Sequence, residues 1–304
     1  MTPGFGAPLF ACVLAMGLAA RPRVAIAQAA PTPRVEIAAA AQATSARRLA
    51  YDLRIDLPVT IAGASAWLAT ELLKNVIGPT TCGWCERSPT GMPAANLVDA
   101  GARIVYRWPD TAVAETLSNV FGYALAPAAA VGTLALASAV DHSIAGLPLD
   151  LLLVAEATSL AMDVNQLVKF AVARERPFHL YDTAPPTGAP LSRDAYLSFF
   201  SGHATFTFAL ATAAGTVATM RGYRAAPAVW ALGLTIASFT SWWRIAADRH
   251  DLSDVLVGAA WGAGVGFLVP FLFHRPIVIR DAVRVAVVPH GVHAGAGLAL
   301  VGGF

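Results

Sequence analysis

Long apolar segments separated by short polar stretches dominate this sequence. The clearest cover residues 112–140, 147–172, 201–220, 226–244 and 250–273. Apolar runs of about 20 residues predict membrane-spanning helices, because that length matches the hydrocarbon thickness of a bilayer. The segments are dense in Ala and Gly, which lets helices approach closely in lipid. We therefore expect an all-α membrane helix bundle of about five to six spans over residues 51–274.

One further segment, residues 58–77, is apolar but interrupted by Glu71 and Lys74. It can either span the membrane or lie at its surface, and this leaves the number of spans open. Residues 96–108 predict a short amphipathic helix capped by Asn96.

The two ends of the chain differ from the middle. Residues 1–27 hold a short apolar run and an Ala-Ile-Ala cleavage signature, which predicts a secretory signal peptide. The first positive charge follows the apolar run, so an uncleaved anchor is the alternative. Residues 28–50 lack periodicity and are expected to form a flexible lead-in. The tail, residues 275–304, is β-branched around a Pro-His-Gly turn and predicts a short β-hairpin.

Composition supports the membrane assignment. Hydrophobic residues make up 56% of the chain and charged residues 13%, against about a quarter charged in soluble proteins. The formal net charge of +2 gives no indication of a nucleic-acid partner. Cys82 and Cys85 form a lone CxxC, and a zinc site would need two more ligands. We expect a local disulfide there.

Three clusters of polar residues lie at the ends of the apolar segments: Lys169 with Arg176-Pro177, Ser201-Gly202-His203, and Arg244 with His250 and Asp254. The first cluster ends one segment and the second begins the next, so both face the same side of the membrane. The third lies one full helical hairpin later and faces that side again. Charged groups beside membrane-length apolar runs are expensive, and their convergence predicts a functional site.

These residue types suit the handling of phosphate. The cations Lys169, Arg176 and Arg244 can neutralise phosphate oxygens, and a helix that opens at Ser201-Gly202 offers free N–H groups to an anion. His250 and Asp254 are four residues apart on one helical face. The carboxylate can fix the imidazole tautomer and support the imidazolium formed when the ring attacks phosphorus. His203 is then available as the acid for the leaving group.

Arginine placement predicts the orientation. Arg221 and Arg224 lie in a short loop on the side opposite the clusters, as do Arg275, Arg280 and Arg284. Short Arg-rich loops stay cytoplasmic, so the site should face the periplasm. If a signal peptide leaves residue 28 outside and residues 58–77 also span the membrane, the site would instead face the cytoplasm. The simplest resolution is that 58–77 does not cross fully.

The three clusters together resemble the type 2 phosphatidic acid phosphatase (PAP2) superfamily, whose pattern is K-x6-R-P, P-S-G-H and S-R-x5-H-x3-D. This chain has Lys169-x6-Arg176-Pro177, Phe200-Ser201-Gly202-His203 and Trp243-Arg244-x5-His250-x3-Asp254. Phe200 replaces the pattern's Pro, and Trp243 replaces its Ser and so removes a hydroxyl. The resemblance implies a helical membrane fold without a metal or other cofactor.

The roles that the resemblance implies are specific. His250 would be the nucleophile that forms a phosphohistidine, Asp254 its orienter and His203 the general acid. The phosphate would be held by Lys169, Arg176, Arg244, Ser201 and Gly202. The expected protein is a multi-pass phosphatase of a bacterial inner membrane, acting on the phosphomonoester or pyrophosphate of a lipid.

Three alternatives stay open. They are a soluble periplasmic acid phosphatase of the same superfamily, a vanadate-dependent haloperoxidase, and a non-catalytic membrane scaffold. Outside the three clusters, the histidines His142, His274, His290 and His293 are interpreted as exposed polar residues.

Overall fold

The computed structural model of the chain describes residues 46–181, 192–277, 286–292 and 295–301. The helices that run along the bundle are α1 (Leu53–Ile77), α3 (Thr111–Asn119), α4 (Ala126–Val140), α5 (Leu147–Val172), α7 (Gly202–Arg221), α8 (Ala226–Ala246) and α9 (Leu252–Phe273). A π-helical turn, η1 (Val120–Leu125), joins α3 to α4. Shorter elements are α2 (Leu97–Tyr106), η2 (Ile144–Gly146), α6 (Pro177–Leu180) and η3 (Arg193–Tyr196). All five apolar segments predicted from the sequence are helical.

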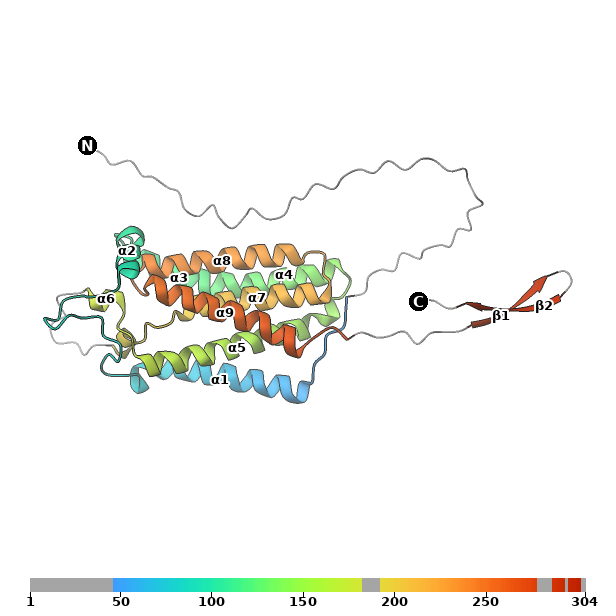
Figure 1. The fold of residues 1–304 in the computed structure, drawn as a ribbon, viewed down its shortest axis with the longest axis horizontal. Helices are drawn as coiled ribbons and strands as arrows, with labels where there is room; N and C mark the ends of the chain where they lie inside the picture. Colours follow the sequence, from blue (N-terminus) through green and yellow to red (C-terminus); the bar gives the residue numbers. More distant parts are fainter. Residues whose placement is uncertain (1–45, 182–191, 278–285, 293–294, 302–304) are drawn as a thin grey trace, which may run out of the picture. The chain divides into compact units, whose positions relative to one another are not determined.

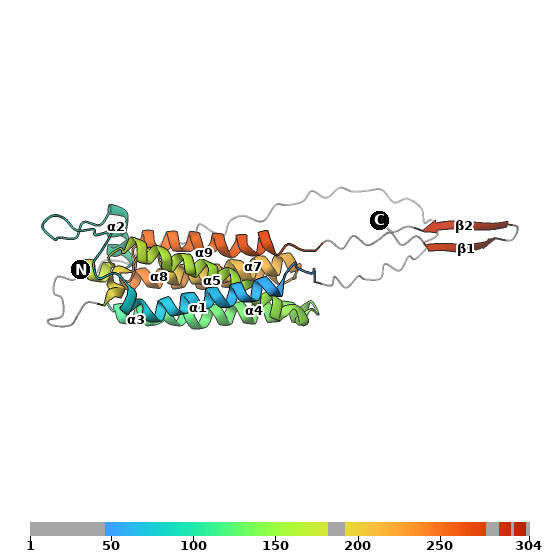
Figure 2. The same ribbon diagram turned by 90° about the horizontal axis from the view of Figure 1, so that it is seen from below.

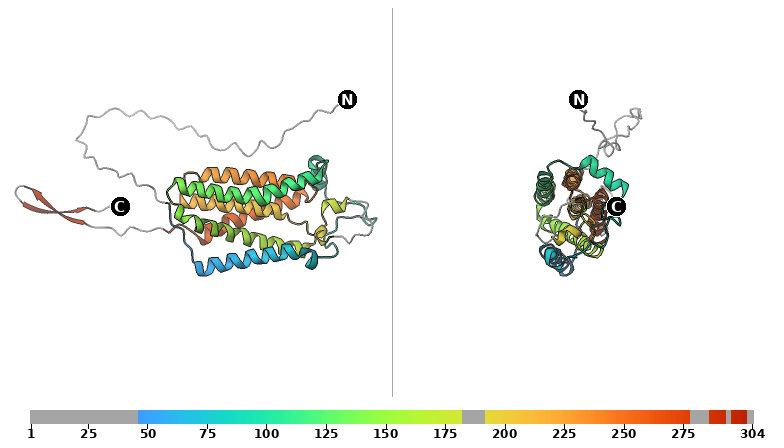
Figure 3. Two further views of the ribbon diagram at one scale, coloured as in Figure 1. Left: turned by 180° about the vertical axis from the view of Figure 1, so that it is seen from behind. Right: turned by 90° about the vertical axis from the view of Figure 1, so that its left-hand side faces the viewer.

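Helix α7 lies at the centre of the bundle (Figure 3), and almost all of its residues are buried. Its closest partner is α9, which presents Gly258, Gly262 and Gly266 to it. A Cβ on Gly262 would run into the carbonyl of Thr205, and one on Gly266 into the hydroxyl of Thr212. Residues four apart share a helix face. The glycines therefore let the backbones of α7 and α9 approach directly, as small residues do in membrane bundles.

The outward faces of the outer helices are apolar. Leu72 of α1, Leu136 of α4, Leu167 of α5 and Phe273 of α9 are each more than 60% exposed. By length and hydropathy, three helical stretches of the described chain can cross a membrane: Thr111–Val140, Ile144–Val172 and Leu252–Phe273. Apolar surface of this extent on a long helix bundle is what a lipid environment stabilises.

Helix α1 is longer than expected, an unbroken helix of 25 residues beside α5. Asp56 in its first turn lies beside His274 at one end of the bundle. Lys74 in its last turn lies 3.3 Å from Asp194 at the other end. Helix α1 therefore runs the length of the bundle (Figures 1 and 2), and the expectation that residues 58–77 stop short of a full membrane crossing stays a prediction.

Helix α2 lies across the end of the bundle where α8 ends and α9 begins (Figure 1). As predicted, Asn96 caps it, and the side chain accepts hydrogen bonds from the backbone N–H groups of Val98 and Asp99. Its large aliphatic residues face away from the protein, since Leu97 is 91% exposed and Ile104 83%, whereas Ala102 is buried. An amphipathic helix with its apolar face turned outward suits the interface between lipid and water.

The segments before α1 and after α9 meet at the other end of the bundle. The Ala50 N–H donates to the Arg275 carbonyl over 3.0 Å, and the Ile277 N–H to the Arg48 carbonyl over 2.8 Å. The last residues of the expected flexible lead-in are thus tied down, whereas residues 1–45 lie outside the described part. In the tail, β1 (Ala286–Val292) pairs antiparallel with β2 (Gly295–Val301).

Candidate active site

The three polar clusters meet at the end of the bundle that carries α2, since Arg176 contacts His250 and Gly202 lies beside Lys169. Helices α5 and α8 end there, and α7 and α9 begin there. The structure brings together all eight residues predicted for the site, and all eight are buried: Lys169, Arg176, Ser201, Gly202, His203, Arg244, His250 and Asp254. Chain direction alone produces this convergence, because consecutive antiparallel helices return to the same end.

The imidazole of His250 lies between a guanidinium and a carboxylate. Its Nε2 is 3.0 Å from Nη1 of Arg176, and its Nδ1 is 3.4 Å from Oδ2 of Asp254. A guanidinium can only donate, so Nε2 presents its lone pair and the proton lies on Nδ1. Burial, together with the positive charges of Arg176, Arg244 and Lys169, lowers the pKa of His250 well below its usual value. The ring is therefore neutral at pH 7, with an unprotonated nitrogen turned toward the cations.

The carboxylate of Asp254 is held from several sides. It accepts hydrogen bonds from the Ser198 hydroxyl (2.5 Å), Nη1 of Arg174 (2.7 Å) and the Asp251 N–H (3.2 Å). These donors fix the plane of the carboxylate that faces His250. The sequence reasoning missed both Arg174 and Ser198, although each lies within three residues of a predicted site residue.

Arg174 is fully buried and gathers four carboxylates. Besides Asp254, its Nη2 lies 2.7 Å from Glu86, 2.9 Å from Asp99 and 3.1 Å from Asp251. We call these five residues the Arg174 clasp. Burying a guanidinium without carboxylate partners would cost a large free energy. Its partners come from the loop before α2, from α2 and from the start of α9, so the clasp joins these three segments to the site. Burial, followed by repulsion from Asp254, raises the pKa of Asp251 to about 8.

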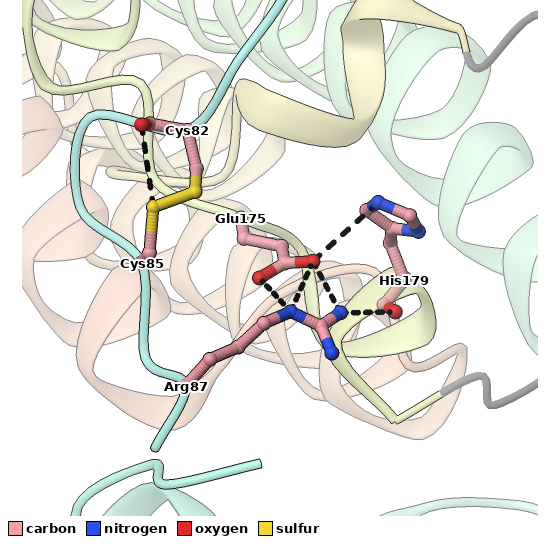
Figure 4. The surroundings of a disulfide bond; sticks show 5 residues. All are labelled: Cys82, Cys85, Arg87, Glu175 and His179. Atoms are coloured by element: carbon pink, nitrogen blue, oxygen red, sulfur yellow. Dashed lines mark hydrogen bonds and ion pairs between the residues drawn. A yellow bond between two sulfur atoms is a disulfide. The ribbon is translucent and has the colours of Figure 1, made fainter. Parts of the chain in front are cut away.

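The loop before α2 supplies Glu86 to the clasp, and it lies beside the chain segment that carries Glu175 (Figure 4). Cys82 and Cys85 form a disulfide within it, as expected from the CxxC. The Trp84 ring between them lies 4.5 Å from the clasp guanidinium. Further along, the guanidinium of Arg87 lies 2.6 Å from the carboxylate of Glu175. Trp84 and Arg87 therefore hold this loop to the chain segment that carries Arg174 and Glu175.

Two of the expected phosphate ligands are placed by different means. Arg176 is held in plane because it donates to the Asp194 carbonyl and carboxylate, at 2.8 and 3.0 Å, and to the Arg249 carbonyl at 2.9 Å. Within the described residues, Lys169 has no ion pair. A Cβ on Gly202 would lie 3.1 Å from the Lys169 ammonium. The glycine thus lets this cation lie against the N-terminus of α7, where an anion is favoured.

His203 packs against the π-helical turn η1. Its Nε2 lies 2.9 Å from Oδ1 of Asn119, the residue before the turn, and its ring centroid is 4.5 Å from that of Tyr123. A Cβ on Gly122 would come within 3.0 Å of the imidazole. An amide oxygen only accepts, so this contact keeps a proton on Nε2. π-Helical turns occur frequently at functional sites, but hydropathy gave no sign of this one.

Arg244 is the third cation. Its Nη1 donates to the hydroxyl of Ser118 over 3.0 Å, while its Nε has no hydrogen-bond partner within the described residues. Its carbonyl accepts from the His250 N–H at 3.3 Å, which ties the end of α8 to the histidine. A buried guanidinium with an unused donor can take up a further acceptor, as a phosphate oxygen would supply.

The two departures from the family pattern have local consequences. The Phe200 carbonyl accepts from the Asn165 amide at 2.8 Å, so this backbone turn is held from α5. The Trp243 ring packs edge-on against Trp108 with centroids 4.5 Å apart. Trp243 therefore packs in an apolar cluster with Ala114 and Ala246 and offers no substitute for the serine hydroxyl of the pattern.

Taken together, the site holds a neutral imidazole whose Nε2 lone pair faces Arg176, a second imidazole protonated at Nε2, three buried cations and a helix N-terminus. This arrangement can bind a tetrahedral anion, attack it and protonate a leaving oxygen.

Comparisons with known proteins found a family model, a relative and a solved structure that are similar to this chain. A family model described as the PAP2 superfamily matches residues 150–276. Over 113 residues the chain is 35% identical to a lipid A 1-phosphatase from Rhizobium johnstonii, a match covering 36% of this chain and 42% of that protein. The match thus spans less than half of that relative. The chain is also similar to the crystal structure of a transmembrane PAP2-type phosphatidylglycerolphosphate phosphatase from Bacillus subtilis. That similarity has a TM-score of 0.41 at 16% identity and covers 71% of this chain and 94% of that one.

Proposed function

Because residues 150–276 make this chain a member of the PAP2 superfamily, we propose that it is a membrane phosphatase that removes phosphate from a lipid phosphomonoester or pyrophosphate. The observation that carries the proposal is the environment of His250. Its unprotonated Nε2 faces Arg176 at 3.0 Å while its Nδ1 faces Asp254. A neutral imidazole oriented in this way among buried cations is suited to attack phosphorus.

The proposed reaction has two steps. Nε2 of His250 forms a bond to phosphorus as the bond to the leaving oxygen breaks, and His203, acting as the imidazolium, gives that oxygen the proton of its Nδ1 and becomes a neutral ring that keeps Nε2–H on Asn119. The ring becomes a phosphohistidine, and Asp254 stabilises the charge on its Nδ1–H. Water then attacks the phosphorus, His203 takes the proton of the water, and the N–P bond breaks to restore neutral His250 and release phosphate. Each step needs no metal, because Lys169, Arg176 and Arg244 neutralise the phosphate oxygens.

A lipid is the favoured substrate class. The site lies at the end of an apolar bundle, and the exposed apolar face of α2 lies at the same end. A lipid whose tail stays in the bilayer would therefore have its phosphate group at the level of the site. The relative named lipid A 1-phosphatase adds support for a phosphorylated glycolipid. We propose that the soluble alternative, a periplasmic acid phosphatase, does not apply.

We further propose a multi-pass protein of a bacterial inner membrane whose site faces the periplasm. The far end of the bundle carries Arg47, Arg221, Arg224 and Arg275, and short segments rich in Arg remain cytoplasmic. A fully spanning α1 would fit this orientation with residues 46–52 beside these arginines on the cytoplasmic side, which would require an N-terminal segment that does not leave residue 28 outside.

The test is phosphate release by detergent-purified protein over a panel of phosphatidic acid, a prenyl pyrophosphate and a lipid glycosyl-1-phosphate, with a chelator present. We expect release from at least one lipid, acid-labile labelling of the wild-type protein by a substrate with radioactive phosphate, and neither signal with His250→Ala. His142→Asn at the far end of the bundle is the matched control and should behave as wild type. Absence of turnover on the whole panel would favour a scaffold, and full activity of His250→Ala would exclude the mechanism.

A further inference from the structure

A second group of ionisable side chains lies at the end of the bundle opposite the active site. Asp56 of α1, Glu156 of α5 and His274, the residue after α9, each direct one ligand atom to a common point, and these atoms lie within 4.8 Å of one another. The side chains are buried, with 6%, 7% and 2% of their residue surfaces exposed. His274 was interpreted from the sequence as an exposed polar residue, and that interpretation is wrong.

The hydrogen bonding of His274 fixes which nitrogen faces the carboxylates. Its Nδ1 lies 3.1 Å from the Ala50 carbonyl, which can only accept, so the proton of a neutral ring lies on Nδ1. Nε2 then directs its lone pair toward Oε2 of Glu156, 3.4 Å away. Within the described residues, neither of these two buried atoms has a hydrogen-bond partner. Two facing acceptors repel each other unless a proton or a cation lies between them.

Charge points to a cation. Asp56 and Glu156 bring two buried carboxylates together, and no Lys or Arg of the described chain forms an ion pair with either of them. A proton on His274 would balance one negative charge and leave the other uncompensated, which is unfavourable in a buried environment. A divalent ion would balance both.

Distance supports the same conclusion. A tetrahedral ion with bonds of about 2.0–2.1 Å to nitrogen and oxygen holds its ligand atoms about 3.3 Å apart, close to the 3.4 Å between His274 and Glu156. The Nδ1–H bond to a backbone carbonyl is the usual way in which a ligating histidine is oriented.

We propose that Asp56, Glu156 and His274 bind a divalent transition-metal ion, with Zn²⁺ as the preferred ion. Imidazole with carboxylates suits Zn²⁺ better than Mg²⁺ or Ca²⁺, which prefer all-oxygen sites. The ion would join the first helix, α5 and the last helix at the end of the bundle far from the chemistry. Its role is structural, since the distant active site contains none of these residues.

The experiment uses the full chain in detergent, carrying an affinity tag free of histidine. After dialysis against a chelator and its removal, Zn²⁺ is titrated by calorimetry into wild type, Glu156→Gln, His274→Gln and the control His142→Asn. His142 is an exposed histidine at the same end of the bundle. We expect wild type and His142→Asn to bind one more Zn²⁺ per chain than Glu156→Gln and His274→Gln. We also expect Zn²⁺ to raise the thermal midpoint only in the first two.

Any Zn²⁺ bound at the catalytic histidines cancels when the proteins are compared, because all four proteins keep those histidines. If His274→Gln fails to fold, Asp56→Asn replaces it. Equal Zn²⁺ binding by wild type and Glu156→Gln would overturn the proposal. A second result would also overturn it: both variants are less stable than wild type, but Zn²⁺ does not change the thermal midpoint of wild type. The three residues would then form an ion pair without a metal. Phosphate release does not enter either readout, so failure here is separate from failure of the proposed function.

Discussion

Replacement of Asp254 by Asn tests the central feature of the site. The carboxylate lies 3.4 Å from Nδ1 of His250 and accepts from Ser198 and Arg174. The Asn side chain has the shape of the native carboxylate but no negative charge, and its NH2 group cannot accept a hydrogen bond from the Nδ1–H of His250. The imidazole then loses both the tautomer that exposes Nε2 and the partner that stabilises its charged form.

Two magnitudes follow. The fall in kcat should be about 100- to 10,000-fold, the range found when the carboxylate that orients a catalytic histidine is removed, with a change in KM below about threefold. The loss in stability should be only about 1.5–3 kcal/mol, the value of a hydrogen bond to a charged group. It stays below the cost of an unpaired buried charge because Arg174 keeps Glu86 and Asp99, at 2.7 and 2.9 Å.

Asp251→Asn is the matched control, because Asp251 contacts the same guanidinium and lies three residues away. With a pKa of about 8, Asp251 is mostly protonated at pH 7, so the amide imitates its native state. We expect kcat near wild type. A carboxyl whose folded pKa lies above its unfolded value of about 3.9 loses stability as pH rises between the two. Asp251→Asn should therefore gain stability relative to wild type from pH 5 to pH 8.

The assay is steady-state phosphate release on the lipid identified by the panel, together with thermal unfolding of the same preparations. If Asp254→Asn kept more than a third of the wild-type kcat, or if both variants lost activity to the same degree, the assignment of Asp254 as the orienter of His250 would be refuted.

Further predictions address the anion site, the pH profile and the orientation. Gly202→Ala places a methyl 3.1 Å from the lysine ammonium and should weaken phosphate inhibition about tenfold, or about 1.4 kcal/mol. Gly264→Ala, where a Cβ meets nothing within 4 Å, should not; equal effects would contradict the close approach. Since the pKa of His250 is lowered and the neutral ring attacks, activity should persist as pH falls through 6.5, and an acid limb centred above 6.5 would contradict this. An impermeant maleimide should label Thr90→Cys in spheroplasts but Arg224→Cys only after lysis, and the reverse pattern would invert the proposed orientation.

Much of the helical layout was predictable from the sequence because each long helix coincides with an apolar segment. The convergence of the clusters was predictable for a related reason. Lys169, Ser201 and His250 each lie at the boundary of such a segment, and alternation of helix direction brings these boundaries to one end. Neither step required knowledge of how the helices pack.

The supporting residues were not predictable in this way. Arg174 contacts Asp99 and Glu86, which are 75 and 88 residues earlier in the chain, and no local pattern encodes so long a separation. His274 was misjudged because a histidine next to Arg275 at a helix end resembles a surface residue, whereas the segment before α1 covers it. Helix α1 ends at Ile77 as predicted but begins at Leu53, before the predicted start at Pro58, because Asp52 caps it and the helix continues through Pro58.

The π-helical turn η1 has a consequence for chain length. It accommodates one residue more than an α-helical path would, so the side chains of α3 are rotated relative to those of α4. One residue corresponds to about 100° around a helix axis. Deleting any single residue of 120–125 would leave the hydropathy profile intact but turn Ser118 and Asn119 away from Arg244 and His203. Related chains of different length in this turn should therefore hold the proposed general acid, His203, by other residues.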